Sequence, residues 1–425
     1  MRHNDAPSAN PIKKDRWFYR HRYAFSIFFF ILLYNSLVVK RLNLWKVTEI
    51  TYAYHAVDFS IGFNSQILPG AIYNLLLGDN RSMLSASIYE TVLLLLFFAG
   101  VAFMLERFIL SIAPDGRPDV LKLMFFYLTG AYTFAIFTYE LGMLDVYWLF
   151  FSIFALLFIK KKVVRAIVPV FFVLSLLVHF SSAVSYLVFF GILILYNASI
   201  AKNKKEKIVY FLILTVSALL SVGLLLFLLK NQGTGMNYDI TAFRYFMKDR
   251  GSDYLLYYNY AFYNKYVDTD VVSPETYAIA SPVARILAVI GERIAFNFKL
   301  TSTGLKKQIH NLVATLIILA PIVAFIYKVL FRFFKAQKEN KLKKVTLLLM
   351  MVQFPFTLTA LLYSLDIVRW FTHGFLIFFT LFIYLMYHEE KLRDLFFEEA
   401  GRYRDVRIQL LYALSYACYT LRVYG

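Results

Sequence analysis

The polar residues best suited to chemistry lie in short segments beside long apolar runs. Asp58 stands in Val57-Asp58-Phe59-Ser60, beyond the first apolar run. A carboxylate at this place can deprotonate an acceptor hydroxyl or hold a divalent cation; the alternative is an Asp that is solvated in a turn or caps a short helix. Arg81 follows the turn Gly78-Asp79-Asn80, where it can meet a phosphate or remain a solvated loop arginine.

A second polar segment lies between two apolar runs near the C-terminus. Asp366 and Arg369 are three residues apart, a spacing that lets them pair on one face of a helix. One interpretation is a structural ion pair anchored by Trp370. The other is a functional site in which Asp366 acts in catalysis and Arg369 clamps phosphate oxygens with its planar fork. His373 lies one turn beyond Arg369 and would face the same cavity.

Further candidates come from the remaining boundaries between apolar and polar sequence. His179 can carry a proton near neutral pH or satisfy a helix-end carbonyl. Glu140 and Asp145 are five residues apart and can coordinate a metal or remain solvated turn residues. Arg250 can contribute to substrate binding from a long Tyr-rich loop, and Glu90 is a candidate for a charge at membrane depth.

The composition shows what must position these residues. Of 425 residues, 60% are hydrophobic and 17% are charged, against about 45–50% and 25% in soluble domains. The apolar residues form runs long enough to cross a hydrocarbon core, which takes roughly 20 helical residues. We therefore expect an all-α, polytopic transmembrane bundle. The predicted spans are 23–39, 87–105, 121–138, 145–159, 166–179, 182–197, 208–229, 311–331, 345–363 and 370–386.

The net charge of +18 does not indicate a nucleic-acid partner, because the basic residues form short clusters between apolar runs. Such clusters mark cytoplasmic loops. Lysines at 160–162 and at 202–207 flank the region around His179, so two short helices must carry the chain out and back. The same rule places both termini in the cytoplasm of a multi-pass cell-membrane protein.

The predicted membrane domain covers residues 1–388, with outer loops at 40–86 and 230–310. The apolar stretch 71–77 is too short to span and should lie along the interface, as should a helix at 285–300. Residues 389–425 read as an amphipathic cytoplasmic tail. Cys418 is the only cysteine, which excludes an intrachain disulfide, and the first apolar run lacks a signal-peptidase site, so it is expected to be retained.

The motifs of soluble nucleotide-binding and hydrolytic enzymes are missing from the sequence. It contains no P-loop, no G-x-S-x-G and no H-E-x-x-H, which argues against ATP hydrolysis and zincin-type proteolysis.

The layout resembles two groups of bacterial membrane enzymes, the GT-C-fold glycosyltransferases and the Wzy- or EpsG-type polysaccharide polymerases. The similar segments are 58–70, 179–182 and 366–370. The resemblance implies work at the outer face on sugars linked to polyprenyl phosphate or diphosphate. By the GT-C pattern Asp58 would be the catalytic carboxylate, with Glu140 or Asp145 as a second acid. By the polymerase pattern Arg369 or Arg250 would hold the diphosphate.

The leading hypothesis is therefore a cell-envelope protein that transfers or polymerises lipid-linked sugars. Its partners would be the bilayer, a polyprenyl-linked saccharide and other glycan-assembly proteins, and a divalent cation stays open as a cofactor. The alternatives are a transporter or flippase of the lipid-linked saccharide, which would place its charges in mid-bilayer, and a non-catalytic membrane assembly protein.

Overall fold

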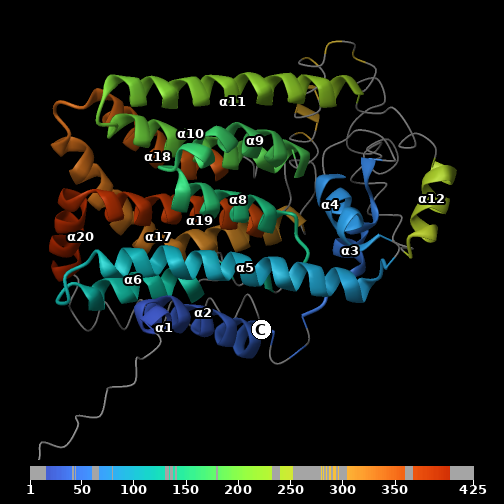
Figure 1. The fold of residues 1–425 in the computed structure, drawn as a ribbon, viewed down its shortest axis with the longest axis horizontal. Coiled ribbons are helices and arrows are strands. Elements are labelled where there is room, and N and C mark those ends of the chain that lie inside the picture. The colour runs from blue at the N-terminus through green and yellow to red at the C-terminus, as the bar shows by residue number, and fades with distance from the viewer. Residues whose placement is uncertain are drawn as a thin grey trace, which may run out of the picture.

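The computed structural model of the chain contains helices and no strands in the part that it describes, and Figure 1 shows the helices side by side in one bundle. The described residues are 16–40, 43, 45–59, 67–78, 80–129, 134, 137–138, 141–178, 180–231, 240–251, 279, 281, 284, 287–288, 291–292, 295, 304–358 and 367–402.

Three helices in the described residues are long and apolar enough to cross a membrane. They comprise Arg22–Val39, formed by α2 (Arg22–Tyr34) and the π-helical turn η1 (Asn35–Val39), then α5 (Met83–Leu110) and Lys204–Leu228 of α11 (Lys204–Asn231). Each covers one of the predicted spans. A short helix, α1 (Arg16–Arg20), precedes the first of them.

Shorter or partly described helices occupy the other predicted spans. They are α6 (Arg117–Thr129), α8 (Asp145–Phe158), α9 (Lys162–Val178), α10 (Phe180–Ser199), α17 (Gly304–Ala336), α18 (Lys341–Leu358) and α19 (Ile367–His388). The helical fold class is thus confirmed, whereas the number of spans stays a prediction. Only the first half of the predicted span 121–138 is described as a continuous helix, because α6 ends at Thr129.

The region around His179 contains two helices, as predicted. The helix α9 ends at Val178 and α10 begins at Phe180, and His179 itself lies outside the described residues. The two basic clusters that flank this pair come together at one end of the bundle, where Arg165 Nη1 donates to Glu206 Oε1 at 3.1 Å. The chain therefore turns back between α9 and α10.

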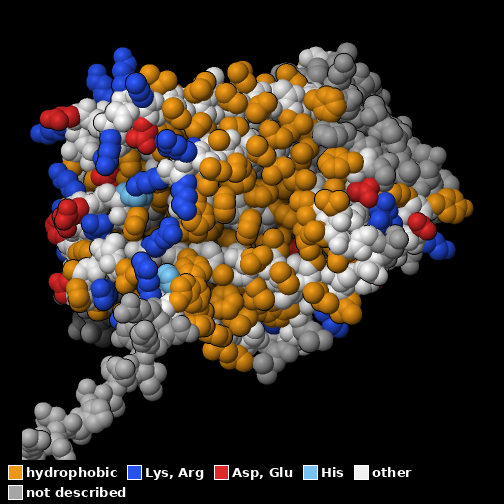
Figure 2. Space-filling view, in the orientation of Figure 1, with side chains coloured by type: hydrophobic (Ala, Val, Ile, Leu, Met, Phe, Trp, Pro, Cys, Tyr) orange, Lys and Arg blue, Asp and Glu red, His pale blue; other side chains and the backbone are white. Residues whose placement is uncertain are grey.

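Basic side chains gather at that end of the bundle, next to a wide band of hydrophobic side chains (Figure 2). The turns between α5 and α6, α8 and α9, α10 and α11, and α17 and α18 all lie there (Figure 1). We call this the basic end. This gathering of Lys and Arg side chains at one end agrees with the one-sided distribution of basic residues from which the topology was predicted. The band of hydrophobic side chains beside it is the kind of surface that contacts a bilayer.

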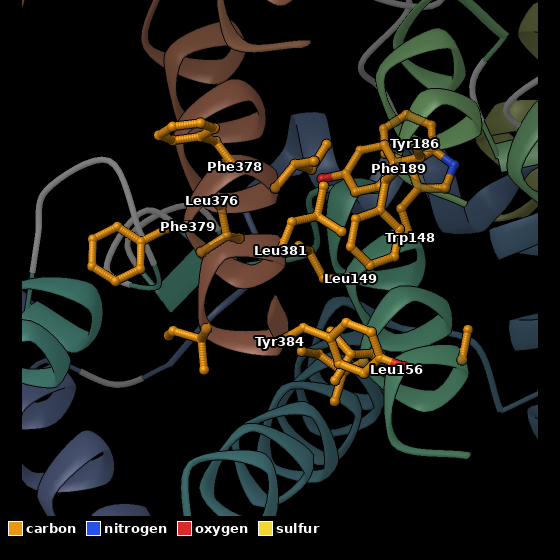
Figure 3. Packing of buried hydrophobic residues seen from close by; sticks show 14 of the residues in the cluster. Trp148, Leu149, Leu156, Tyr186, Phe189, Leu376, Phe378, Phe379, Leu381 and Tyr384 are labelled. Carbon is orange, nitrogen blue, oxygen red and sulfur yellow. The ribbon is translucent and has the colours of Figure 1, made fainter. Parts of the chain in front are cut away.

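The centre of the bundle is aromatic and lies among α8, α10 and α19 (Figure 3). Trp148 is fully buried and stacks on Tyr186 with ring centroids 4.8 Å apart. Its indole N–H donates to Ser175 O at 2.9 Å, which satisfies the one polar atom of the side chain. This packing fixes α8 against its neighbours.

The opposite end holds the short helices α3 (Glu49–Ala56), α4 (Ile67–Leu77) and α12 (Ile240–Asp249). Thr48 begins α3 with a capping box completed by Thr51, which satisfies two backbone N–H groups. The helix α4 corresponds to the stretch predicted to be apolar and too short to span. It crosses α3 so closely that a Cβ on Gly70 would overlap Val57 O.

The predicted tail begins with a helix at the basic end, α20 (Glu390–Arg402). Glu399 is fully buried there and pairs with Lys328 Nζ at 2.6 Å and with Arg332 Nη1. The helix therefore docks on α17 as well as presenting charge to solvent. Residues 403–425 and most of the predicted interfacial helix at 285–300 lie outside the described residues.

Candidate functional site

Two of the predicted site residues meet at the end of the bundle formed by α3, α4 and α12. Arg250 Nη1 lies 2.6 Å from Asp58 Oδ2, although the residues are 192 positions apart. Both side chains are largely but not fully buried, with 13% and 18% of their surface exposed. Asn74 Nδ2 donates to the same carboxylate oxygen at 2.9 Å. The contact places a carboxylate and a guanidinium within reach of solvent.

Several contacts hold Arg250 in this position. Its Nη1 also donates to Ala56 O at 2.9 Å, and its guanidinium lies 4.0 Å from the centre of the Phe246 ring. The Tyr52 hydroxyl donates to Arg250 O at 2.8 Å. Burial raises the pKa of Tyr52 above its ordinary value, with a further increase from Tyr73, so this phenol stays protonated at neutral pH and keeps its hydrogen bond.

A fully buried histidine and glutamate lie directly behind this ion pair. His55 Nε2 is 2.6 Å from Glu90 Oε1, and neither side chain is exposed. His55 Nδ1 lies 2.8 Å from Thr51 O, and because a carbonyl only accepts, Nδ1 must carry a hydrogen. The contact between Nε2 and Oε1 therefore holds one more proton, which resides on either the imidazole or the carboxyl group.

Tyrosines surround this proton-holding pair. The Tyr147 hydroxyl lies 3.0 Å from Glu90 Oε1 and 3.0 Å from the Tyr89 hydroxyl. The rings of Tyr73 and Tyr89 pack edge-on against His55. Among the described residues, Glu90 Oε2 has no hydrogen-bond partner, so the carboxyl group keeps one acceptor site unused inside the bundle.

A second buried pair joins α8 to α19. Asp145 Oδ1 lies 3.0 Å from His373 Nε2, and both side chains are fully buried. The rings of Trp148, Tyr186 and Trp370 pack around the imidazole with centroids 5.3–5.8 Å away. No described group makes a hydrogen bond with good geometry to His373. An aromatic cage therefore holds this imidazole beside the carboxylate.

The first turn of α8 brings the two buried pairs together. Tyr147 contacts Glu90, and Asp145, two residues earlier, contacts His373. Polar groups thus extend from the partly exposed Asp58–Arg250 pair through α3 and α5 into the bundle. We call the residues Asp58, Arg250, His55, Glu90, Tyr147, Asp145 and His373 the polar cluster.

The remaining predicted residues do not join this geometry in the described part of the chain. Arg81 Nε donates to Gly78 O at 2.7 Å, as expected for a loop arginine. Glu140, His179 and Asp366 lie outside the described residues. Arg369 belongs to α19, but its side chain also lies outside what the structure describes, so its pairing with Asp366 stays a prediction.

The metal site proposed for Glu140 and Asp145 also stays a prediction. Within the described ranges, no group of three or more His, Cys, Asp or Glu side chains is arranged to hold a metal ion. Asp145 contacts His373 there, and Glu140 lies outside those ranges.

His55 and Tyr147 are the members of the cluster that the sequence did not single out. His55 lies in 40–86, which was predicted to be an outer loop, whereas residues 49–56 form a helix whose residues 51–56 are buried. The spacing Thr48-x-x-Thr51 before an aromatic run is the available signal for this helix, since Thr at an N-cap commonly begins one. Glu90 was identified as a charge at membrane depth, but its partner was not.

Comparisons with known proteins found no relative of this chain. No family model, no curated protein and no solved structure matches the chain at a significant level. The polar cluster and the helical bundle around it are therefore the ground on which a function has to be argued.

Proposed function

We propose that this protein is a multi-pass membrane enzyme that transfers or polymerises sugars linked to polyprenyl phosphate or diphosphate, with the polar cluster as its active site. The observation that supports this most is the Asp58–Arg250 contact at 2.6 Å. It joins a candidate base and a candidate phosphate ligand at the end of the bundle away from the basic end. In the predicted topology that end faces outward, where lipid-linked saccharides are assembled.

The chemistry requires Arg250 to exchange partners. An incoming lipid phosphate would take the guanidinium, for which phosphate is a well-matched bidentate ligand, and would release the Asp58 carboxylate. An acceptor hydroxyl then forms a bond to the anomeric carbon while the bond from that carbon to the phosphate oxygen breaks. The hydroxyl proton goes to Asp58, and the electron pair leaves with the lipid phosphate, whose charge Arg250 stabilises.

The buried His55–Glu90 pair acts in this scheme as a positioning element. Ala56, whose carbonyl accepts from Arg250, directly follows His55 in the chain, and His55 ties this turn to α5 through Glu90. Movement of α3 would therefore displace the arginine. A general base held in place contributes about 10²- to 10⁴-fold to a rate, which sets the scale of the expected effects.

A transporter is the second candidate, and one observation favours it. The cluster contains two fully buried pairs of histidine and carboxylate, His55–Glu90 and Asp145–His373. Ionisable groups inside a membrane bundle often mark proton or substrate pathways. A flippase that couples proton movement to the export of a lipid-linked saccharide would use the same groups without bond formation.

The experiment compares surface polysaccharide and lipid-linked precursor in cells that carry the wild type, a deletion, Asp58→Asn or Arg250→Gln. Two exposed residues provide matched controls, Asp394→Asn and Lys248→Gln, with equal membrane expression verified for all. The proposal expects both site variants to lose at least 100-fold of the long polymer and to accumulate precursor that an external glycosidase can digest. The two control variants should keep wild-type polymer.

The outcomes separate the candidates. If the accumulated precursor is protected from the external glycosidase, it faces inward, and the flippase hypothesis replaces the transferase hypothesis. If the deletion changes neither polymer nor precursor, both glycan functions are wrong. If only the deletion changes them and the site variants behave as wild type, the polar cluster is not the active site.

A further inference from the structure

A crevice opens at the basic end, far from the polar cluster. It has a volume of about 600 Å³ and lies among the end of α1 with the adjoining His21, the part of α5 from Leu96 onward and the part of α8 from Phe150 onward. Its walls are aromatic and aliphatic, with Phe97, Phe103, Phe150 and Phe154 among them. Gly100 also lines it and allows α5 and α8 to approach, because a Cβ there would lie 3.1 Å from Ile153.

Cationic side chains lie at one end of this apolar crevice. Arg20 and Arg107 line it, and no described carboxylate pairs with either. Arg107 is held beside the opening by Nη1 donating to Leu157 O at 3.3 Å and by the Phe158 ring, 5.7 Å from its guanidinium carbon. An anionic group bound there would therefore meet two positive charges.

The one acidic residue that lines the crevice does not cancel this charge. Glu106 is 3% exposed at its side chain and lies 2.7 Å from His21 Nδ1. Its other oxygen accepts from Ala24 N at 3.1 Å. These contacts use the carboxylate to attach α2 to α5, which leaves the two arginines as the unpaired charges of the crevice within the described part of the chain.

The length of the crevice suits a lipid chain. The lining residues of α5 run from Leu96 to Leu110, and 14 helical steps of about 1.5 Å make about 21 Å. One leaflet contributes about half of a hydrocarbon core of about 30 Å. The crevice therefore matches the depth of one leaflet plus its headgroup layer, with Arg107 near the headgroup level and Leu96 near the middle.

We infer that this crevice is a binding site for one anionic phospholipid of the leaflet at the basic end. The phosphate lies between Arg20 and Arg107, and an acyl chain runs along Phe154 and Phe97. A second cavity of about 150 Å³ shares Arg107 and Leu157 and adds Lys160, so a headgroup with more than one phosphate would find a third cation. The site differs in position and ligand from the proposed active site.

The test uses the full chain purified in a neutral detergent, with lipid binding measured by native mass spectrometry. Phosphatidylglycerol is titrated against phosphatidylcholine with the same acyl chains, and inorganic phosphate serves as the headgroup without a tail. The variant Arg20→Gln/Arg107→Gln is compared with Lys204→Gln/Lys205→Gln, which removes two charges from the same end. The control lysines are exposed on α11, across the bundle from α2 (Figure 1).

Wild type and the lysine variant should prefer phosphatidylglycerol to phosphatidylcholine. The arginine variant should bind phosphatidylglycerol about 30-fold more weakly than wild type does. This fold-change follows from about 1 kcal/mol for each of the two basic residues near an anionic headgroup. Phosphatidylcholine binding should be equal in all three. Equal affinity of the wild type for both lipids overturns the inference, as does an equal loss in both double variants. Displacement of the lipid by millimolar inorganic phosphate would show an anion site that does not use the crevice.

Discussion

Replacing Glu90 with Ala should destabilise the protein more than any substitution of an exposed glutamate. The carboxyl group is fully buried, and it contacts His55 at 2.6 Å and Tyr147 at 3.0 Å. Breaking a buried pair by removing one partner costs about 3–5 kcal/mol, because the other group remains buried without compensation. The free energy of unfolding should therefore fall by a large part of the total.

The structure refines this magnitude. Tyr147 keeps the Tyr89 hydroxyl as a neighbour after the substitution, so the lost contact with Tyr147 contributes little to the decrease in the free energy of unfolding. His55 loses its only described partner at Nε2, and the truncated side chain leaves a cavity that adds to the loss. We expect about 4 kcal/mol for Glu90→Ala. Glu90→Gln keeps an acceptor of the same shape, and we expect about 1–2 kcal/mol for it.

The assay is reversible unfolding in mixed micelles, followed by tryptophan fluorescence. Glu339→Ala is the matched control, since that side chain is exposed in the turn before α18, and it should stay within about 0.5 kcal/mol of wild type. A double-mutant cycle with His55→Ala should give a coupling of at least about 1.5 kcal/mol. A loss below about 1 kcal/mol for Glu90→Ala, or a coupling near zero, would refute the buried pair.

Two further predictions concern the packing of α4 and of α20. Gly70→Ala should lower the free energy of unfolding by about 3 kcal/mol or more, because its Cβ would overlap Val57 O, whereas Gly223→Ala, in open space within α11, should be neutral or stabilising. The hydrogen bond from Arg332 lowers the pKa of Glu398 below its ordinary value of 4.5. Because a lowered pKa stabilises the fold above the ordinary value and loses that effect as pH falls below it, amide exchange in α20, corrected for intrinsic rate, should accelerate below about pH 4.5. Arg332→Ala should accelerate it at neutral pH, and unchanged exchange in both conditions would contradict the docking.

Sequence patterning predicted the helices of the bundle well, because the forces that define them are local. The apolar runs bounded by lysines predicted the approximate residue ranges of α11, α9 and α10, and the structure brings the basic clusters that flank these helices to one end of the bundle. The helix at 49–56 was not predicted within the outer loop 40–86, since a helix of eight residues carries too few apolar positions to stand out. Its burial depends on contact with α5, which no local pattern reveals.

The candidate site was predicted as a set of residues but not as an arrangement. Asp58 and Arg250 were each identified, yet their contact across 192 positions depends on how α12 returns to α3. His373 was expected to face the same cavity as Arg369, whose side chain lies outside the described residues, and its contact with Asp145 on α8 was not predicted. Residue type and membrane depth can be estimated from one sequence, but the choice of partner is a property of the tertiary fold.

If α8 spans the bilayer, as the predicted topology has it, its short length would expose part of the polar cluster to the membrane voltage. Its 14 residues measure about 21 Å, and the lysines that follow it place its C-terminal end at the basic surface. In a bilayer with a core of about 30 Å, Asp145 then lies about 9 Å inside the opposite surface. A proton that reaches Asp145 or His373 from that side crosses about a third of the electric field. At about 2.3 kcal/mol per charge per 100 mV, the electrical work of moving one charge to this depth would be about 0.7 kcal/mol for each 100 mV.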